Sequence, residues 1–302
     1  ATVDLIPRHE ERVLLVLGFQ DIFAAADAVP AVMSYRPDAC EGVDDLLLED
    51  MKNKDMEVTD LSLFPEGKGW LLVEFGGAST EEALEKAKKL QDKAKEETGA
   101  IDFALYEDEN DQEMLWEGRE SGLGATAHVP RQTDAWEGWE DSAVAPERLG
   151  DYLRDLRKLY KKFGYRGPFY GHFGQGLVHT RITFDLKSSD GIQNFRAFIS
   201  EATDLVKSHG GVSSGEHGDG QSKAEFLEKI YGGRLIEAFR KFKAIWDPSG
   251  KMNPGKVVDP YRVDENLRLG RDYAPFQPET HFQYPEDNGS FAYATERCVG
   301  VG

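Results

Sequence analysis

Two glycine-rich segments carry the side chains of this sequence that are best suited to chemistry. The segment GHFGQGLVH contains His172 and His179, and the segment GEHGDG, further along the chain, contains the adjacent pair Glu216 and His217. Imidazole nitrogens and a carboxylate oxygen suit a divalent cation such as Zn, Mn or Fe. Three such ligands leave coordination positions for a substrate, and a histidine beside them is suited to moving protons. The two segments therefore predict a catalytic metal site.

Glycines decide whether the two histidines of the first segment can meet. Along an unbroken strand the odd offset puts His172 and His179 on opposite faces, but Gly174 and Gly176 allow the chain to turn between them. Beyond the turn, alternation predicts that His179 and Arg181 point the same way, into the site. The alternative interpretation is that both histidines are buried and satisfied by backbone carbonyls.

Two arginines are candidates for holding a substrate carboxylate. Arg119 lies in the segment LWEGRE and is able to clamp a carboxylate through two hydrogen bonds; the alternative is a surface ion pair with Glu113 or Glu120. Arg181, on the inward face of its predicted strand, has the same capacity, and its alternative partner is Asp185.

Composition excludes several classes of protein. The 302 residues have a formal net charge of −19, so nucleic-acid phosphates and anionic membrane surfaces would repel the chain. No apolar segment approaches the ~20 residues of a membrane span. The two cysteines make a disulfide framework improbable, which favours a cytoplasmic protein. Peripheral association of a full-length protein with a membrane stays open, and we expect the chain to be a fragment of a longer protein.

The elements that must position these residues follow from hydrophobic periodicity. In the first part the expected strands are 12–19, 39–48, 69–75 and 101–106, and the expected helices are 21–34 and 79–97. In the second part the expected strands are 140–145, 167–172, 178–186 and one ending near 216, and the expected helices are 147–163 and 192–208. Both parts have the order β-α-β-β-α-β, which predicts an α+β fold of two ferredoxin-like units at about 11–108 and 139–217, each an antiparallel sheet with helices on one face. No sequence repeat accompanies this order.

The end of the chain is less periodic. Helices are expected at 222–231 and 233–246, followed by two turns. Residues 259–302 are rich in Pro, Tyr, Asp and Asn, which indicates an extended wrapping tail or linker.

Three motifs together resemble a known family. GHFGQGLVH, GEHGDG and FKAIWDPSGKMNPGK are similar to the C-terminal, substrate-binding domain of FAD-linked oxidases of the vanillyl-alcohol oxidase superfamily. The branch they resemble is that of D-lactate, glycolate and D-2-hydroxyglutarate dehydrogenases. The resemblance spans roughly residues 12–258 within a domain at 1–258, and it implies a duplicated ferredoxin-like cap.

The resemblance also assigns roles to residues. It places the metal ligands at His172, His179 and Glu216, the catalytic base at His217, the substrate-carboxylate arginine at Arg119, and a cofactor-binding turn, which returns the chain towards the flavin, at Asn253. Departures from the family pattern leave the substrate open: they are Gln175 to Leu177 in place of Asp-Gly-Asn, Arg181 in place of an asparagine, Leu123 in place of a threonine, and no lysine before Asp141.

The family resemblance implies further domains. FAD would be held by a domain that precedes this region, and Cys298 would be the first thiolate of an iron–sulfur domain that follows it. The expected function is oxidation of a 2-hydroxy acid to a 2-oxo acid with metal assistance and hydride transfer to FAD, so this fragment alone is expected to be inactive. Two alternatives are a metal-dependent hydrolase and a non-catalytic ligand-binding module.

Overall fold

Four strands from the first half of the chain and one short strand from the second half form an antiparallel sheet. The computed structural model describes residues 2–3, 5, 9–56 and 60–297. The sheet has the order β4-β1-β3-β2-β6, and every neighbouring pair is antiparallel. Its strands are β1 (Glu11–Phe19), β2 (Ala39–Asp44), β3 (Gly69–Gly77), β4 (Asp102–Tyr106) and β6 (Tyr170–Gly171). The predicted α+β class with an antiparallel sheet is confirmed.

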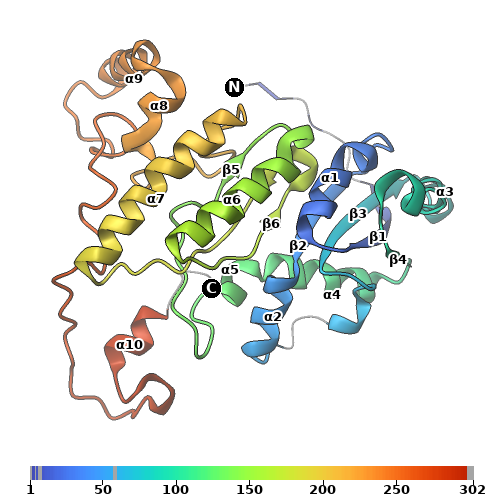
Figure 1. Ribbon diagram of the computed structural model, residues 1–302, viewed down its shortest axis with the longest axis horizontal. Helices are drawn as coiled ribbons and strands as arrows, with labels where there is room; N and C mark the ends of the chain where they lie inside the picture. The colour runs from blue at the N-terminus through green and yellow to red at the C-terminus, as the bar shows by residue number, and fades with distance from the viewer. Residues whose placement is uncertain (1, 4, 6–8, 57–59, 298–302) are drawn as a thin grey trace.

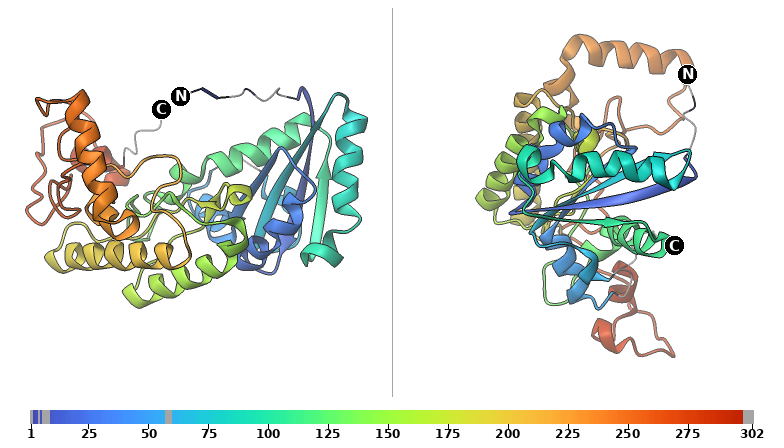
Figure 2. Two further views of the ribbon diagram at one scale, coloured as in Figure 1. Left: turned by 90° about the horizontal axis from the view of Figure 1, so that it is seen from above. Right: turned by 90° about the vertical axis from the view of Figure 1, so that its right-hand side faces the viewer.

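Helices cover both faces of this sheet. Side chains of β1 alternate between two cores, with Leu15 and Leu17 in one and Leu14 and Val16 in the other. The first core lies under α1 (Ile22–Met33) and α3 (Thr80–Gln91), and the second under α2 (Asp45–Asn53), α4 (Glu109–Glu120) and α5 (Gly122–Thr126). Figure 2 shows the sheet with helices on either side. The two helices expected for this unit, α1 and α3, do lie on one face, and the further helices α2, α4 and α5 cover the other. This second layer forms because β1 carries apolar side chains on both of its faces.

Capping side chains set where several helices begin. Asp21 accepts a hydrogen bond from the amide of Ala24, and Ser79 accepts one from the amide of Glu82. Asp44 likewise accepts from Leu46 and begins α2. The predicted strand at 39–48 therefore ends at Asp44, because a capping carboxylate there turns the apolar residues that follow into a helix.

The second half of the chain contains little regular sheet. β5 (Ser142–Ala143) pairs with β7 (Leu177–Val178), and isolated bridges join Ala143 to Val212 and Tyr170 to His179. Of the predicted strand at 178–186, only Val178 lies in a regular strand, and His179 and Ile182 form isolated bridges. The chain bends beyond them, where the Phe184 amide donates to the carbonyl of Ile182. Duplication of the first unit stays a prediction. Two helices cover this half, namely α6 (Leu149–Phe163) and α7 (Ser189–Ser208).

Pairing of β6 with β2 joins the two halves. Gly171 lies opposite Gly42 and Tyr170 opposite Val43. The close fit requires glycine at position 42, since a Cβ atom there would lie 2.4 Å from the ring of Phe173. Figure 1 shows β6 running from the second half to the edge of the sheet.

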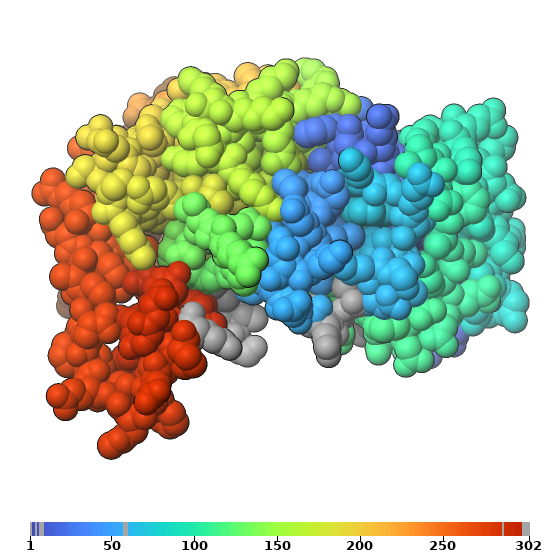
Figure 3. All heavy atoms as spheres, turned by 60° about the horizontal axis from the view of Figure 1, so that its bottom comes forward, coloured from blue at the N-terminus to red at the C-terminus, as the bar shows by residue number. Residues whose placement is uncertain are grey.

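The C-terminal part leaves the sheet. α9 (Gly233–Trp246) matches the helix expected at 233–246, and none of its residues is buried. α8 (Leu227–Tyr231) covers only the second half of the helix expected at 222–231. The tail is mostly irregular, with a short helix α10 (Phe291–Glu296), and lies at the end of the molecule opposite α3 (Figure 3). Among the described residues, no helix combines the length and apolarity needed to cross a membrane. The remaining short helices are η1 (Leu61–Leu63), η2 (Ala94–Thr98), η3 (Pro146–Arg148), η4 (Phe173–Gln175), η5 (Ala224–Phe226) and η6 (Pro285–Asp287).

Candidate functional site

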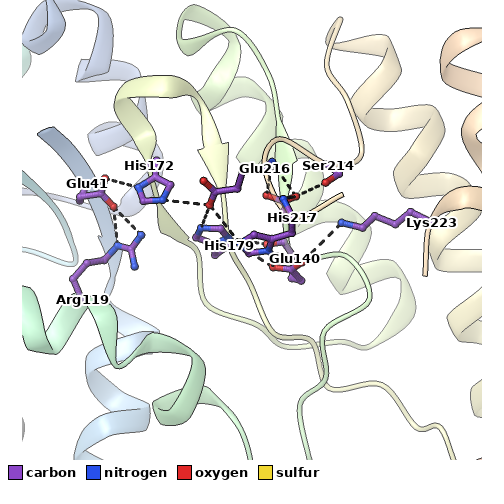
Figure 4. Close-up of polar contacts among 10 residues, drawn as sticks. Glu41, Arg119, Glu140, His172, His179, Ser214, Glu216, His217 and Lys223 are labelled. Atoms are coloured by element: carbon purple, nitrogen blue, oxygen red, sulfur yellow. Dashed lines mark hydrogen bonds and ion pairs between the residues drawn. The ribbon is translucent and has the colours of Figure 1, made fainter. Parts of the chain in front are cut away.

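One carboxylate oxygen lies among three imidazoles. Oε1 of Glu216 is 3.4 Å from Nε2 of His172, 3.2 Å from Nε2 of His179 and 3.4 Å from Nε2 of His217. The ring of His179 stacks on that of His217 with 5.0 Å between centroids and faces that of His172 edge-on at 5.4 Å. The structure therefore brings together all four residues of the two glycine-rich segments (Figure 4).

The other nitrogen of each imidazole is held by an oxygen acceptor. Nδ1 of His172 lies 2.7 Å from Oε1 of Glu41, Nδ1 of His179 lies 3.0 Å from the carbonyl of Glu140, and Nδ1 of His217 lies 3.0 Å from both carboxylate oxygens of Glu140. Carboxylates and carbonyls only accept hydrogen bonds, so each Nδ1 carries the proton. In the neutral imidazole, each Nε2 then presents a lone pair to the centre of the site.

Strand pairing and tight turns place the first two histidines. His172 directly follows β6, and η4 reverses the chain so that His179 follows β7. The reversal depends on Gly176, which has a φ of 72° and packs so closely that a Cβ atom would lie 1.9 Å from the carbonyl oxygen of Val144. The prediction that glycines let the two histidines converge is thus confirmed in the geometry.

A buried aspartate places Glu216 and His217. The side chain of Asp141 accepts hydrogen bonds from both backbone amides and from the hydroxyl of Ser214. It is fully buried. One potential ligand atom from each of Asp141, His179, Glu216 and His217 lies within 4.8 Å of the others. Sequence analysis named Asp141 only as the position that a lysine precedes in the family pattern and gave it no role, because it belongs to neither glycine-rich motif.

Electrostatics at the site follow from these contacts. Burial opposes ionisation of Glu140, but hydrogen bonds from His179 and His217 outweigh it and lower the pKa of Glu140 to about 2. The pKa of His172 is raised, first through its hydrogen bond to Glu41. Burial works to lower the pKa of His217, yet the hydrogen bond to Glu140 raises it overall.

Arg119 is buried beside the site. Its Nε and Nη2 donate to Oε2 of Glu41 at 3.0 Å and 2.7 Å, and its guanidinium lies 5.4 Å from the ring centroid of Tyr170. The alternative of a surface ion pair with Glu113 or Glu120 is therefore wrong, because Arg119 points inward from α4 to the sheet.

Arg181 is also buried but points elsewhere. It donates to the carbonyl of Ala135 through Nε and Nη2, and Nη2 forms an ion pair of 2.8 Å with Glu137. Its partner is therefore Glu137 and not Asp185, whose carboxylate accepts hydrogen bonds from Lys187 and Ser188.

Other expected functional positions lie outside this cluster. Asn253 is exposed in the turn after α9 and has a left-handed φ of 51°. Leu123 is partly exposed in α5. Cys298, the predicted thiolate of an iron–sulfur cluster, lies outside the described residues. Lys223, which sequence analysis did not single out, is buried with Nζ 4.0 Å from Glu140 and 3.1 Å from the carbonyl of Ser213.

Comparison with known proteins gives one matching family and several relatives. Residues 8–257 match the family described as FAD linked oxidases, C-terminal domain. A D-2-hydroxyglutarate dehydrogenase of Pseudomonas putida is 27% identical over 88% of this chain and 27% of the relative. A glycolate oxidase subunit GlcD of Bacillus subtilis is 27% identical over 85% of this chain and 53% of the relative. A D-lactate dehydrogenase of Archaeoglobus fulgidus is 29% identical over 85% of this chain and 54% of the relative. The chain thus spans between about a quarter and a half of these relatives.

Solved structures share the fold. A p-cresol methylhydroxylase superposes with a TM-score of 0.60 at 13% identity, covering 87% of this chain and 55% of that one. A 4-ethylphenol oxidase of Gulosibacter chungangensis superposes with a TM-score of 0.56 at 14% identity, covering 84% of this chain and 55% of that one.

Proposed function

The chain belongs to the family of C-terminal domains of FAD-linked oxidases, and from this premise we propose that it is the substrate-binding and catalytic domain of a flavin-dependent 2-hydroxy-acid dehydrogenase. The proposed reaction converts a 2-hydroxy acid to a 2-oxo acid with the help of a divalent cation. Relatives named for D-2-hydroxyglutarate, glycolate and D-lactate support this reaction class. Their greater length leaves room for the FAD-binding and iron–sulfur domains that we propose as its partners.

The observation that carries the metal proposal is the direction of three lone pairs. With Nδ1 protonated, the neutral imidazoles of His172, His179 and His217 all present an acceptor nitrogen to Oε1 of Glu216. Acceptors that face acceptors repel unless a cation or added protons lie among them. Imidazole nitrogens with a carboxylate oxygen fit Zn, Mn or Fe, and we propose His172, His179 and Glu216 as the ligands.

The residues of this chain would divide the work as follows. When bound, a cation held by His172, His179 and Glu216 would supply Lewis acidity, and FAD would supply the hydride acceptor. His217 would take the hydroxyl proton at Nε2 as the α-carbon–hydrogen bond breaks and the carbonyl forms. Glu140 at Nδ1 would hold the imidazole in the right tautomer and stabilise its protonated form.

The hydrogen-bond partners of Arg119 and Arg181 distinguish these two candidates for binding the substrate carboxylate. Glu41 occupies Nε and Nη2 of Arg119, which leaves Nη1 for a substrate carboxylate oxygen close to His172. Arg181 is committed to Ala135 and Glu137. We therefore propose Arg119, whose partner Glu41 contacts His172, as the substrate contact. Arg181 would have to release Glu137 before it could bind a substrate carboxylate with the same group.

Metal titration tests the proposal directly. Calorimetric titration of Zn²⁺ or Mn²⁺ into the chelator-treated chain is expected to show one site, which His172→Ala, His179→Ala and Glu216→Gln each weaken. His209→Ala is the control, because His209 pairs with Asp155 away from the cluster. Equal metal affinity in the control and the three site variants would remove the support for this function.

Turnover tests the role of His217. In the full-length protein with FAD, His217→Gln is expected to lower kcat for 2-hydroxy-acid oxidation by at least ~100-fold. Metal affinity should stay close to that of the wild type. Ester hydrolysis by the isolated chain would instead indicate a metal-dependent hydrolase, which needs no flavin.

A further inference from the structure

We propose that Glu41 is a positioning residue that fixes the ring orientation and tautomer of His172, and that Arg119 holds Glu41 in place for this purpose. The inference rests on the proposed metal function. It concerns a residue on β2, far from both glycine-rich segments in the sequence, and it gives Arg119 a role in addition to substrate binding.

The contacts of Glu41 hold its carboxylate in a defined orientation. Its side chain is 7% exposed. Oε1 accepts from Nδ1 of His172 at 2.7 Å, and Oε2 accepts from Nε and Nη2 of Arg119 at 3.0 Å and 2.7 Å. Arg119 thus anchors Oε2 while His172 anchors Oε1, so both oxygens of the carboxylate are held by hydrogen bonds. A carboxylate fixed in this way sets the orientation of the imidazole that donates to it.

Strand register explains why Glu41 meets His172. Gly42 of β2 lies opposite Gly171 of β6 in an antiparallel pair. Continued by one residue, this register places Glu41 opposite His172, which directly follows β6, and residues opposite each other in this way lie close enough for their side chains to interact. The contact is therefore built into the junction of the two halves.

This arrangement has a chemical consequence for metal binding. An imidazole that donates from Nδ1 has its lone pair on Nε2, and Nε2 of His172 is the nitrogen that faces Glu216 at 3.4 Å. A carboxylate behind a ligating histidine fixes the tautomer and raises the basicity of the ligand nitrogen. Glu41 contacts only this histidine of the cluster, whereas Glu140 contacts the other two.

Replacement of Glu41 by glutamine tests the inference. In Glu41→Gln, the amide oxygen is expected to keep accepting from Arg119, so that the NH₂ group faces Nδ1 of His172. A donor at this position favours the His172 tautomer with the proton on Nε2. We expect Zn²⁺ affinity, measured by calorimetry on the whole chain, to fall by about 10–100-fold.

A matched control separates positioning from stability. Glu74 on β3 is also buried and pairs with Arg12 at 3.2 Å, away from the cluster. Glu74→Gln therefore removes a comparable carboxylate and should leave Zn²⁺ affinity unchanged. Equal affinity in Glu41→Gln and Glu74→Gln, with His172→Ala still weakened, would overturn this inference and leave the metal site standing. Unchanged affinity in His172→Ala would instead overturn the metal site itself.

A spectroscopic measurement keeps the test independent of variant folding. Long-range ¹H–¹⁵N correlation of the wild-type, metal-free chain at high pH reports which nitrogen of the neutral His172 ring carries the proton. We expect the Nδ1–H tautomer. Observation of the Nε2–H tautomer would contradict the proposal even if Glu41→Gln failed to fold.

Discussion

Hydrogen bonds to the Asp141 carboxylate hold the second glycine-rich segment in place. It is fully buried and accepts hydrogen bonds from the amides of Glu216 and His217 and from Ser214. Charge-assisted hydrogen bonds to backbone amides are among the stronger ones in proteins. The direction of both functional side chains therefore depends on one carboxylate that does not itself belong to the motif.

Asp141→Asn is expected to lower both stability and metal affinity. In the wild type the Asp141 carboxylate accepts from the amides of Glu216 and His217. In the variant an NH₂ group would replace one accepting oxygen, and this lowers the free energy of unfolding by about 1–3 kcal/mol. Urea denaturation and Zn²⁺ calorimetry measure the two effects. Asp134→Asn is the control, since Asp134 accepts from His128 outside the cluster. A loss of metal affinity no greater than in the control would show that Asp141 does not position Glu216.

At the residue scale, sequence motifs predicted the centre of the site but not its supports. His172, His179, Glu216 and His217 lie in two short glycine-rich segments, so residue type and spacing were enough to group them. Glu41 and His172 are separated by 131 positions, and no local pattern marks a partner at that distance. Such supports follow only from strand register, which a single sequence does not reveal.

Among the elements, the turn between His172 and His179 depends most on backbone geometry. Gly176 combines a φ of 72° with a Cβ direction that runs into the carbonyl of Val144 at 1.9 Å. Gly164, which ends α6, has the same φ of 72° but open space around its Cβ direction. A comparison of the two glycines therefore separates the destabilisation caused by a left-handed backbone conformation from that caused by the steric clash of a Cβ atom.

Gly176→Ala is expected to destabilise the chain far more than Gly164→Ala. The left-handed conformation alone costs a residue with a Cβ about 1–2 kcal/mol. The collision should bring the loss at position 176 to at least about 3 kcal/mol and displace His179. Thermal unfolding and Zn²⁺ titration measure both. Equal losses in the two variants would mean that the turn adapts to a side chain.

Asp247 organises the turn that follows α9. Its carboxylate accepts from the amides of Lys251 and Met252 at 2.8 Å and 2.9 Å and pairs with Lys243 at 2.9 Å. The bond with Lys243, followed by the backbone amides, lowers the pKa of Asp247 to about 2 from an ordinary value of 3.8. The turn leads directly to Asn253, the predicted cofactor contact.

The lowered pKa gives this turn a defined pH dependence. Because the folded pKa lies below the unfolded one, the stabilisation is present above about pH 4 and is lost as pH falls towards 2. The protection factors of the Lys251 and Met252 amides, which are the observed exchange rates corrected for the intrinsic pH dependence, should fall over that interval. Asp247→Asn should show low protection at all pH values, and Asp259→Asn should behave like the wild type. Wild-type protection factors that do not change with pH would contradict the assignment.

Element boundaries show where local pattern stops being informative. Helices α1, α3, α6, α7 and α9 were predicted because apolar residues recur at helical spacing over several turns. Residues 45–48 were predicted as strand because this short apolar run shows no alternation of apolar and polar residues at helical spacing. They form a helix because Asp44 caps its N-terminus. Helix α4 was not predicted, since its buried residues include polar Gln112 and Arg119.

For the whole molecule, burial is unevenly distributed. β1 and β3 lie between two cores, whereas α9 has no buried residue and exposes Phe242, Ile245 and Trp246 by 65%, 74% and 70%. Segments with few buried apolar contacts open at low free energy. The described molecule therefore combines a stable sheet with a weakly held helix.

Hydrogen exchange should separate these two parts. Backbone amides of α9 are expected to exchange at least ~100-fold faster than those in the β1–β3 ladder. Mass spectrometry of proteolytic fragments measures the difference. Comparable protection in both segments would show that α9 is stabilised by contacts beyond those described.

The junction of β2 and β6 makes the geometry of the site depend on how the two halves of the chain are placed relative to each other. Glu41 comes from one half of the chain and His172 from the other, and a hydrogen bond of 2.7 Å joins them. A small change in the angle between the halves would lengthen this bond and turn the imidazole away from Glu216. A molecule that binds across the junction would therefore change the metal affinity of the site without contacting any of the metal-ligand side chains.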